Sequence, residues 1–478
     1  MRTLKLAILA SIIGLIPSIA IGQLENYPLK DYKLPLIRRT SLDLGFTTNS
    51  NGLTGDVTGD GSQKTTTDKF YFSGQGDANW NYYFNSPKWQ TSSTASVSIS
   101  GSASTYVQEQ VQNYSTTGSN LVSSINYGNS SLYYFNKKLF LSFSPQAYTN
   151  YIRQKFSYNE KDNSGATTLD YTNYFNKSSS YFSTGFGVGY GRIEPVWDAH
   201  KMIFTLLDLK KEGRLLREPT TEEITEISQK LSSLMNERYF DTREHTIKEV
   251  TVLDSLLTSM GLTKNGDIGV STALYDNLSY AYLPQRFSGF RVGLEPRIGY
   301  NLYSTKQTGM DRENSHQLTL GIQANLTYQT PINIHWQRTL RLSASYTDMN
   351  IDTKNISPTS KYKESDVSLS GGYGYYPNTR TYFDLTAGGR FRYIDSDQTV
   401  NNQPYRLKYG EVFANGELYY YLSPKVRIDA SAQVSYKTNI DANSIYYSYL
   451  NFDPSLYNTF TSKELSYTFS AKFTYALF

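Results

Sequence analysis

The histidines are the residues of this sequence best suited to chemistry, and they are scattered along the chain as His200, His245, His316 and His335. None stands in a nucleophile motif such as Gly-x-Ser-x-Gly, and none has the spacing of metal ligands. Ser315, directly before His316, forms the one serine and histidine pair that is worth testing as nucleophile and base. The absence of cysteine excludes thiolate metal sites and disulfides. We therefore predict no catalytic centre, no metal site and no cofactor.

One acidic segment resembles the opening of a calcium-binding loop. In Asp56-Val-Thr58-Gly-Asp60-Gly61, oxygen-bearing side chains alternate as they do where several oxygens converge on one cation. The twelfth position of such a loop supplies a bidentate acid, and here it is Thr67. The segment is therefore expected to be a flexible, glycine-rich loop.

Charged residues in the second half of the chain alternate with apolar ones. If the apolar residues face lipid, the charged residues face a shared interior. They can create a transverse field that sorts polar solutes, or they can pair across strands and brace the wall. Both interpretations stay open. The charges expected to line the interior are Arg291, Glu295, Arg297, Arg341, Asp384, Arg390, Arg392, Glu411, Glu417, Arg427 and Asp429.

A cluster of aromatic residues lies between residues 441 and 463. Exposed rings can stack on sugars or contact a partner, and they can also fold inward over an opening. The cluster is therefore a candidate extracellular binding loop, with inward folding as the alternative. Its members are Tyr446, Tyr447, Tyr449, Phe452 and Tyr457.

The elements that would position these residues are strands with a period of two. From Leu318 to Tyr328, and again from Val426 to Tyr436, every second residue is apolar and the residues between are polar. The chain contains 43 Tyr and 23 Phe, only 18% charged residues, and a mean hydropathy of -0.49. Only alternate residues of a transmembrane barrel face lipid, so a half-polar sequence can still present an apolar outer surface.

Short turns and long polar connections alternate along the chain, which is typical of an all-β transmembrane barrel. We predict about 14 antiparallel strands, with roughly 12 to 16 plausible. Long loops are expected at 49–67, 108–120, 159–177, 306–314, 353–364, 395–406 and 441–463. The expected strands are 41–49, 67–84, 90–106, 120–135, 139–157 and 178–193, then 288–305, 315–330, 335–351, 365–376, 381–395, 406–421, 425–440 and 463–478.

The stretch between the two sets of strands has a helical period. Thr220 and Glu223 form a capping box, and apolar residues recur at helical spacing on both sides of it. Residues 197–262 are therefore predicted to be a three-helix element. Six crossings precede it, so parity places it in the periplasm. The expected division is 1–22 signal peptide, 23–40 periplasmic N-terminal arm, 41–194 strands 1–6, 195–287 helical insertion and connector, and 288–478 strands 7–14.

Both ends of the chain indicate export to the outer membrane. Arg2 and Lys5 precede an apolar stretch that ends in a small-x-small cleavage site, which is typical of a secretory signal. The last strand alternates and ends on an aromatic residue, and it resembles the terminal strand of Gram-negative outer-membrane β-barrels. Phe473, Tyr475 and Phe478 carry this resemblance, although Phe478 is one step out of phase. The resemblance implies an outer-membrane location and recognition by the barrel insertion machinery.

The expected partners follow from this class. They are outer-membrane lipid, the insertion machinery and a possible periplasmic protein bound at residues 197–262. Basic residues form no stripe, so no nucleic acid is expected, and the oligomeric state stays open. The favoured function is a porin-like channel for small polar solutes, with a helical element that gates it or docks a partner. A non-conducting anchor for an envelope assembly is the alternative, and an outer-membrane hydrolase ranks third.

Overall fold

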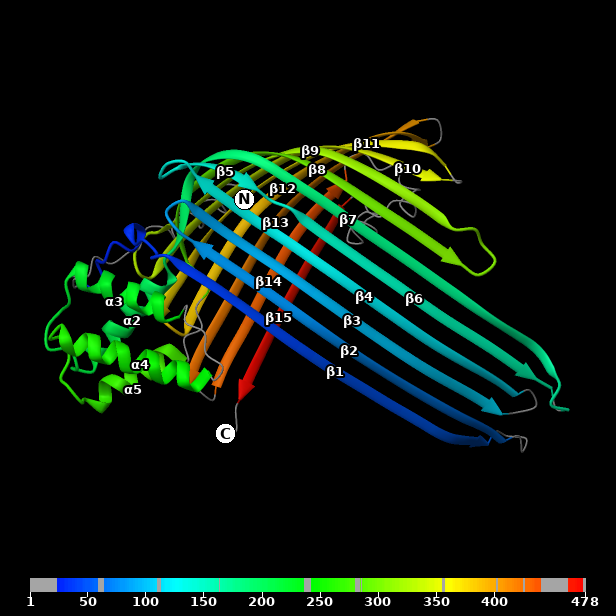
Figure 1. Ribbon diagram of the computed structural model, residues 1–478, viewed down its shortest axis with the longest axis horizontal. Coiled ribbons are helices and arrows are strands. Elements are labelled where there is room, and N and C mark those ends of the chain that lie inside the picture. Colours follow the sequence, from blue (N-terminus) through cyan, green and yellow to red (C-terminus); the bar gives the residue numbers. More distant parts are fainter. Residues whose placement is uncertain are drawn as a thin grey trace, which may run out of the picture.

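The computed structural model describes residues 24–58, 64–109, 113–162, 164–235, 242–279, 284, 286–354, 357–400, 403–423, 426–439 and 463–475. They form one antiparallel sheet with four α-helices gathered at one end of it (Figure 1). None of the described helices has both the length and the apolarity needed to cross a membrane. The expected signal peptide, the aromatic loop (Tyr446, Tyr447, Tyr449, Phe452 and Tyr457) and Phe478 lie outside the described residues.

The strands follow one another around the sheet in chain order. Strands β5 and β6 both pair with β4 and β7, so the fifteen strands occupy fourteen positions, the number predicted. The break between β5 and β6 falls at Pro145, which has no N–H to donate to a neighbouring strand. The strands are β1 (Ile37–Thr58), β2 (Lys64–Asn85), β3 (Trp89–Glu109), β4 (Asn113–Tyr134), β5 (Leu139–Phe143), β6 (Gln146–Lys161), β7 (Thr167–Pro195), β8 (Phe287–Gln307), β9 (Glu313–Pro331), β10 (Trp336–Lys354), β11 (Ser357–Asn378), β12 (Thr381–Val400), β13 (Gln403–Ser423), β14 (Val426–Asn439) and β15 (Lys463–Tyr475).

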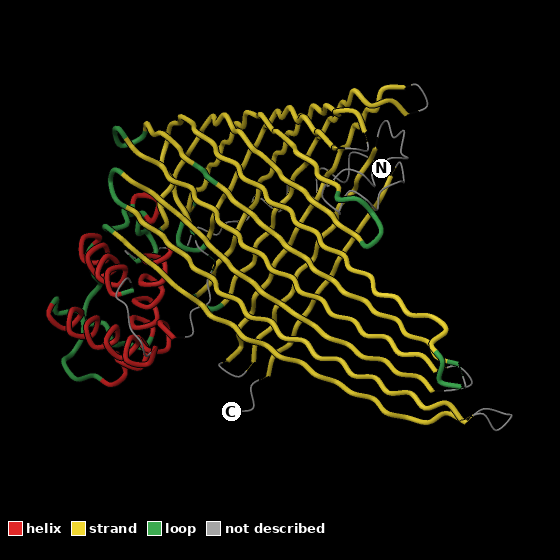
Figure 2. Tube along the Cα trace, turned by 45° about the vertical axis from the view of Figure 1, so that its right-hand side comes forward, coloured by secondary structure: helices red, strands yellow, loops and turns green. Residues whose placement is uncertain are grey.

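Most of the strands are longer than predicted, because segments expected to be loops continue the hairpins. The expected loop 108–120, for example, is reduced to the few residues between Glu109 and Asn113. A strand of about 22 residues at roughly 3.3 Å per residue reaches about 70 Å, whereas about 9 to 11 residues cross a bilayer. The tips of the long hairpins therefore project beyond any membrane (Figure 2). Water on both faces removes the need for apolar alternation at these tips. The strands predicted from alternation therefore end before the observed strands do.

The two faces of the sheet differ in chemistry, as the alternating pattern predicts. One face, here called the outer face, exposes Leu44, Phe46 and Tyr467 at 75, 79 and 80% of their surface. Leu42 opposite Trp80, and Ala78 opposite Val97, continue this apolar face from strand to strand. The other face, here called the inner face, carries mostly polar and charged side chains. Exposed apolar side chains in such numbers indicate contact with lipid.

The sheet curls, so that β1–β4 and β12–β15 lie on opposite sides of it (Figure 1). Among the described residues, β1 pairs only with β2 and β15 pairs only with β14. Pairing of β1 with β15 to close a barrel is therefore not observed in this part of the chain. The described residues therefore form a curled antiparallel sheet whose edge strands are β1 and β15.

The three helices predicted within residues 197–262 are present, and a fourth follows them in the described part of the helical domain (residues 197–279). They are α2 (Trp197–Lys211), α3 (Thr221–Leu234), α4 (Thr242–Ser259) and α5 (Ile268–Ser279). The capping box of Thr220 and Glu223 is present at the start of α3. Helix α5 was missed because its Gly, Val, Ser and Thr residues are weak helix formers. Burial of Val270 and Leu274 against the other helices stabilises it.

The largest buried core lies in this helical domain, at the end of the sheet. The N-terminal arm (residues 24–36), which contains the short helix η1 (Leu29–Asp31), contributes Leu24, Leu29 and Tyr32 to that core. The arm and the helices are therefore one folded unit.

Candidate functional site

The inner face brings four of the charged residues of β11 and β12 into one network. Arg390 Nε lies 2.7 Å from Asp366 Oδ2, and Arg392 Nε lies 2.9 Å from the same oxygen. Arg392 Nε is also 3.1 Å from Glu364 Oε1. On β13, Glu411 stands directly opposite Arg390 in the strand register. Positive and negative groups thus alternate from β11 to β13, and pairing neutralises much of their charge.

A second ion pair lies on β8 of the inner face. Arg297 Nε is 3.8 Å from Glu295 Oε1, and Arg297 Nη1 donates to Gln323 Oε1 at 2.9 Å. Ser142 Oγ donates to Glu295 Oε2 at 3.0 Å, and Ser144 Oγ donates to Oε1 at 2.5 Å. Gly185 leaves the room for this carboxylate, since a Cβ there would lie 2.2 Å from Glu295 Oε1. These contacts therefore fix the Glu295 carboxylate against the inner face of the sheet.

The remaining predicted charges are placed around the rest of the inner face. Asp384 and Glu417 face each other across β12 and β13, and Tyr376 donates a hydrogen bond of 3.0 Å to Asp384. Tyr409 donates to Glu411 at 2.9 Å. Arg427 and Asp429 lie on β14, with Asp429 opposite Lys472 of β15. Ion pairs therefore join β11 to β12, whereas Glu417 and Arg427 are exposed. The sorting of solutes by these charges stays a prediction.

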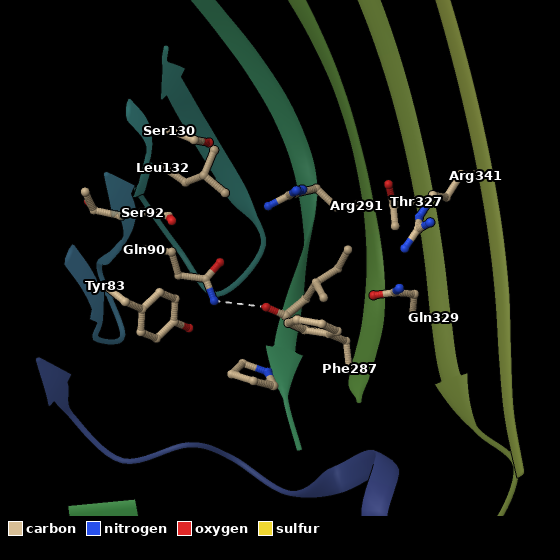
Figure 3. Close-up of a pocket in the computed structure, with 13 residues that line it drawn as sticks. Tyr83, Gln90, Ser92, Ser130, Leu132, Phe287, Arg291, Thr327, Gln329 and Arg341 are labelled. Carbon is tan, nitrogen blue, oxygen red and sulfur yellow. Dashed lines mark hydrogen bonds between the residues drawn. The ribbon is translucent and has the colours of Figure 1, made fainter. Parts of the chain in front are cut away.

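Arg291 and Arg341 differ from Arg297, Arg390 and Arg392, which form ion pairs on the inner face. Both flank Thr327 in the strand register, so the three residues form one row across β8, β9 and β10. The three residues line a pocket of about 360 Å³ between strands β8–β10 and strands β2–β4 (Figure 3). Within the described part of the chain, no carboxylate lies within ion-pair distance of either guanidinium. The pocket is therefore a candidate anion site.

The helical domain is attached to the short turns at the end of the sheet. His200 Nε2 donates to Ile334 O at 2.8 Å, in the β9–β10 turn. Thr379 in the β11–β12 turn donates to Asn277 of α5 at 2.8 Å, and Arg380 pairs with Asp276. The buried Arg286 donates to Asn333 O and Trp336 O, both at 2.9 Å. These contacts hold the helices across that end of the sheet.

The N-terminal arm crosses the same end. It leaves β1 at Ile37, and Lys30 O accepts a hydrogen bond of 2.8 Å from Ser288 Oγ of β8. The arm therefore runs from the first strand to the eighth and passes beneath the Arg291 pocket (Figure 3). Arg39, at the start of β1, pairs with buried Asp198 of α2 at 3.2 Å. Burial raises the pKa of Asp198, and Arg39 and Ser232 oppose this rise.

His200 is a buried titratable group of this attachment. Its side chain is fully buried, and burial lowers its pKa well below the usual value. Nearby Arg286 and His335 lower the pKa further, whereas the hydrogen bond to Ile334 O acts in the opposite direction. In the unfolded chain the ring titrates near pH ~6.5. Below that pH the unfolded chain takes up a proton that folded His200 excludes.

Acidification should therefore loosen the helical domain. The stability that neutral His200 contributes is lost as the pH falls from about 6.5 toward the folded pKa. The equilibrium constant for folding then decreases by at most about tenfold per pH unit. Limited proteolysis within residues 197–279, with a protease active across pH 5 to 8, should show faster cleavage at low pH. Asp198 has the opposite effect, because its raised pKa makes acidification favour the folded state. The variant His200→Gln is therefore the control that isolates the contribution of His200. If cleavage of His200→Gln accelerates at low pH as much as cleavage of the unaltered protein, His200 is not the cause of the pH dependence.

Other candidates from the sequence are not assembled into sites. Ser315 and His316 are neighbours on β9, so their side chains point to opposite faces, and His316 stacks on Tyr300 instead. Asp56 is part of β1 and accepts a hydrogen bond from Thr66 of β2 at 2.8 Å. The described residues hold no cluster of three or more His, Asp or Glu side chains able to bind a metal. Phe473 and Tyr475 lie on β15 with more than half of their surface exposed.

No protein-family model and no curated protein matches this sequence. The structure is similar to the transport unit of the autotransporter AIDA-I from Escherichia coli, at 9% identity over 87% of this chain and 97% of that one, with a TM-score of 0.24. It is also similar to a loop-deletion form of OmpT, an outer membrane protein of Vibrio cholerae (9% identity, 91% and 99% coverage, TM-score 0.27). The monoaromatic hydrocarbon channel CymD is matched as well (10% identity, 89% and 91% coverage, TM-score 0.26).

All three are outer-membrane β-barrels. This is the class, and the location, that the sequence predicts.

Two inner-face acids were missed from the sequence. Glu364 was assigned to a loop, and Asp366 was not included among the lining charges, although both pair with Arg392. Val367 and Leu369 are on the outer face of β11. Asp366 and Glu364 stand one and three residues before Val367, so extending the alternation backwards would have placed both acids on the inner face.

Proposed function

We propose that this chain closes into an outer-membrane β-barrel and acts as a porin-like passage for small polar solutes. In this arrangement β1 pairs with β15, the outer face contacts lipid and the inner face lines water. Fourteen strand positions support closure, because an even number makes the first and last strands antiparallel. The single observation that supports the proposal best is the two-sided sheet, apolar outside and charged inside.

The helical domain and the N-terminal arm would then lie on the periplasmic side and restrict the passage. Their contacts with the β9–β10 and β11–β12 turns support this role. The helical domain begins and ends within one hairpin, because Pro195 pairs with Phe287 and Val196 N donates to Arg286 O at 2.9 Å. It is therefore an insertion that the sheet does not need for its own pairing.

A non-conducting anchor is the second candidate. Neutralised charges on β11 and β12, together with a buried core at one end of the sheet, favour a blocked interior. Leu216, Ile247 and Ile268 of the helical domain are each more than half exposed, so a periplasmic protein could dock there. A hydrolase is the weakest candidate, because Ser315 and His316 point to opposite faces of β9.

Planar lipid bilayers separate the first two candidates. Purified, correctly folded protein should produce stepwise conductance if the inner face lines an open passage. Folding is checked beforehand by the shift in gel mobility on heating. Persistent silence of folded protein would refute the passage and favour the anchor.

A further inference from the structure

We propose that the pocket between β2–β4 and β8–β10 binds a small organic anion that carries a carboxylate and a short apolar portion. The inference depends on the proposed function in one respect only, namely that water reaches the inner face. It goes beyond that function by naming a site and a class of solute.

The charge of the pocket comes from Arg291 and Arg341. Both stand opposite Thr327 on neighbouring strands, so their Cα atoms are about 10 Å apart and their guanidinium groups reach into the same space (Figure 3). Two acids of the adjoining strand segments, Glu194 of β7 and Glu295 of β8, are engaged elsewhere: Glu194 pairs with Arg192, and Glu295 is held by Ser142, Ser144 and Arg297. Two neighbouring cations without a counter-ion repel each other, and a bound anion removes that cost.

The lining supplies the other contacts that such a solute needs. Thr327 and Gln329 lie beside the arginines and can donate further hydrogen bonds to a carboxylate. Leu132, Ile193 and Phe287 form an apolar part of the same pocket. A guanidinium fork matches a planar carboxylate with two parallel hydrogen bonds. The pocket volume of about 360 Å³ fits a small organic solute rather than a bare inorganic ion.

The position of the pocket suggests why the site is there. It lies on the inner face, directly above the N-terminal arm that crosses the end of the sheet (Figure 3). A solute that descends along the inner face would meet these arginines immediately before the restriction formed by the arm and the helical domain.

Calorimetric titration of the full chain in detergent tests the site. The probes are acetate, butanoate and hexanoate, with butanol as the uncharged control and inorganic phosphate as the control for charge alone. We expect hexanoate to bind more tightly than acetate, and butanol not to bind. Arg291→Gln and Arg341→Gln should each weaken hexanoate binding by about tenfold. Arg427→Gln, which removes the same charge from the inner face outside the pocket, should leave binding unchanged.

Several outcomes would overturn the proposal. They are equal weakening by Arg427→Gln, tighter binding of phosphate than of any carboxylate, or no heat of binding at millimolar hexanoate with folded protein. The heat-induced shift in gel mobility shows whether each variant is folded. Binding by a protein that is silent in bilayers would refute the passage and leave the site standing. Conductance without carboxylate binding would refute the site and leave the passage standing.

Discussion

Replacing residues 197–285 with a short Asn-Gly turn should raise the conductance of the protein several-fold and leave the sheet folded. The pairing of Pro195 with Phe287 already brings the two cut ends together, and a two-residue turn suits such a hairpin. The replacement removes the core on which Leu24, Leu29 and Tyr32 of the N-terminal arm rest, so the arm is released as well. Single-channel recording and the heat-induced shift in gel mobility measure the two effects.

A milder variant tests the same restriction without removing it. Thr379→Val with Arg380→Ala removes the contacts of the β11–β12 turn with Asn277 and Asp276 of α5. We expect intermediate conductance with frequent switching between levels, because the helical domain keeps its contacts with the β9–β10 turn. Arg338→Ala is the matched control, since Arg338 bonds to Tyr328 rather than to the helices. Unchanged conductance in both the milder variant and the replacement would exclude a restricting role.

The second large effect is expected in ion selectivity. Asp366→Asn removes the carboxylate shared by Arg390 and Arg392 but keeps one side-chain oxygen to accept a hydrogen bond. Two guanidinium groups then face the passage with less compensation, so the reversal potential in a salt gradient should shift toward anions. Loss of a charge partner that is 14% exposed should also cost roughly 2 kcal/mol of stability.

The control for this variant lies on the same face of β11. Ser368→Ala changes the residue opposite Arg390 without changing any charge. Its reversal potential should equal that of the unaltered protein. An unchanged reversal potential in Asp366→Asn would show that permeating ions do not pass this network.

The strand positions could be predicted because lipid on one side and water on the other impose a period of two. Leu318 to Tyr328 shows this period, and the structure places Leu318, Leu320 and Ile322 together on the outer face. The same physics explains the errors at the distal ends of the strands. From Asn113 to Asn120 the strand carries no alternating apolar residues, and pairing with both β3 and β6 holds it in the sheet.

Contacts between distant segments could not be predicted from periodicity. The packing of the N-terminal arm against α3 joins Tyr27 to Thr225 by a hydrogen bond of 2.8 Å, across nearly two hundred residues. Nothing in the sequence near Tyr27 indicates that partner. Alternation did place Arg291 and Arg341 on the inner face, but strand register decides that both flank Thr327.

A cysteine scan along β9 tests the two-sided sheet most directly. The chain has no cysteine, so a single cysteine can be placed at each position from 318 to 328 without a background signal. One sample of each variant is reconstituted in lipid vesicles and treated with a water-soluble maleimide. A second sample is labelled with a fluorophore before reconstitution, and a lipid-borne quencher is then added to it.

We expect the odd-numbered positions, including Gln323 and Asn325, to react with the maleimide. The even-numbered positions, including Leu320 and Ile322, should resist it and be quenched from the lipid. Equal reactivity at odd and even positions, with no quenching from lipid, would contradict a membrane barrel whose inner face is lined by water.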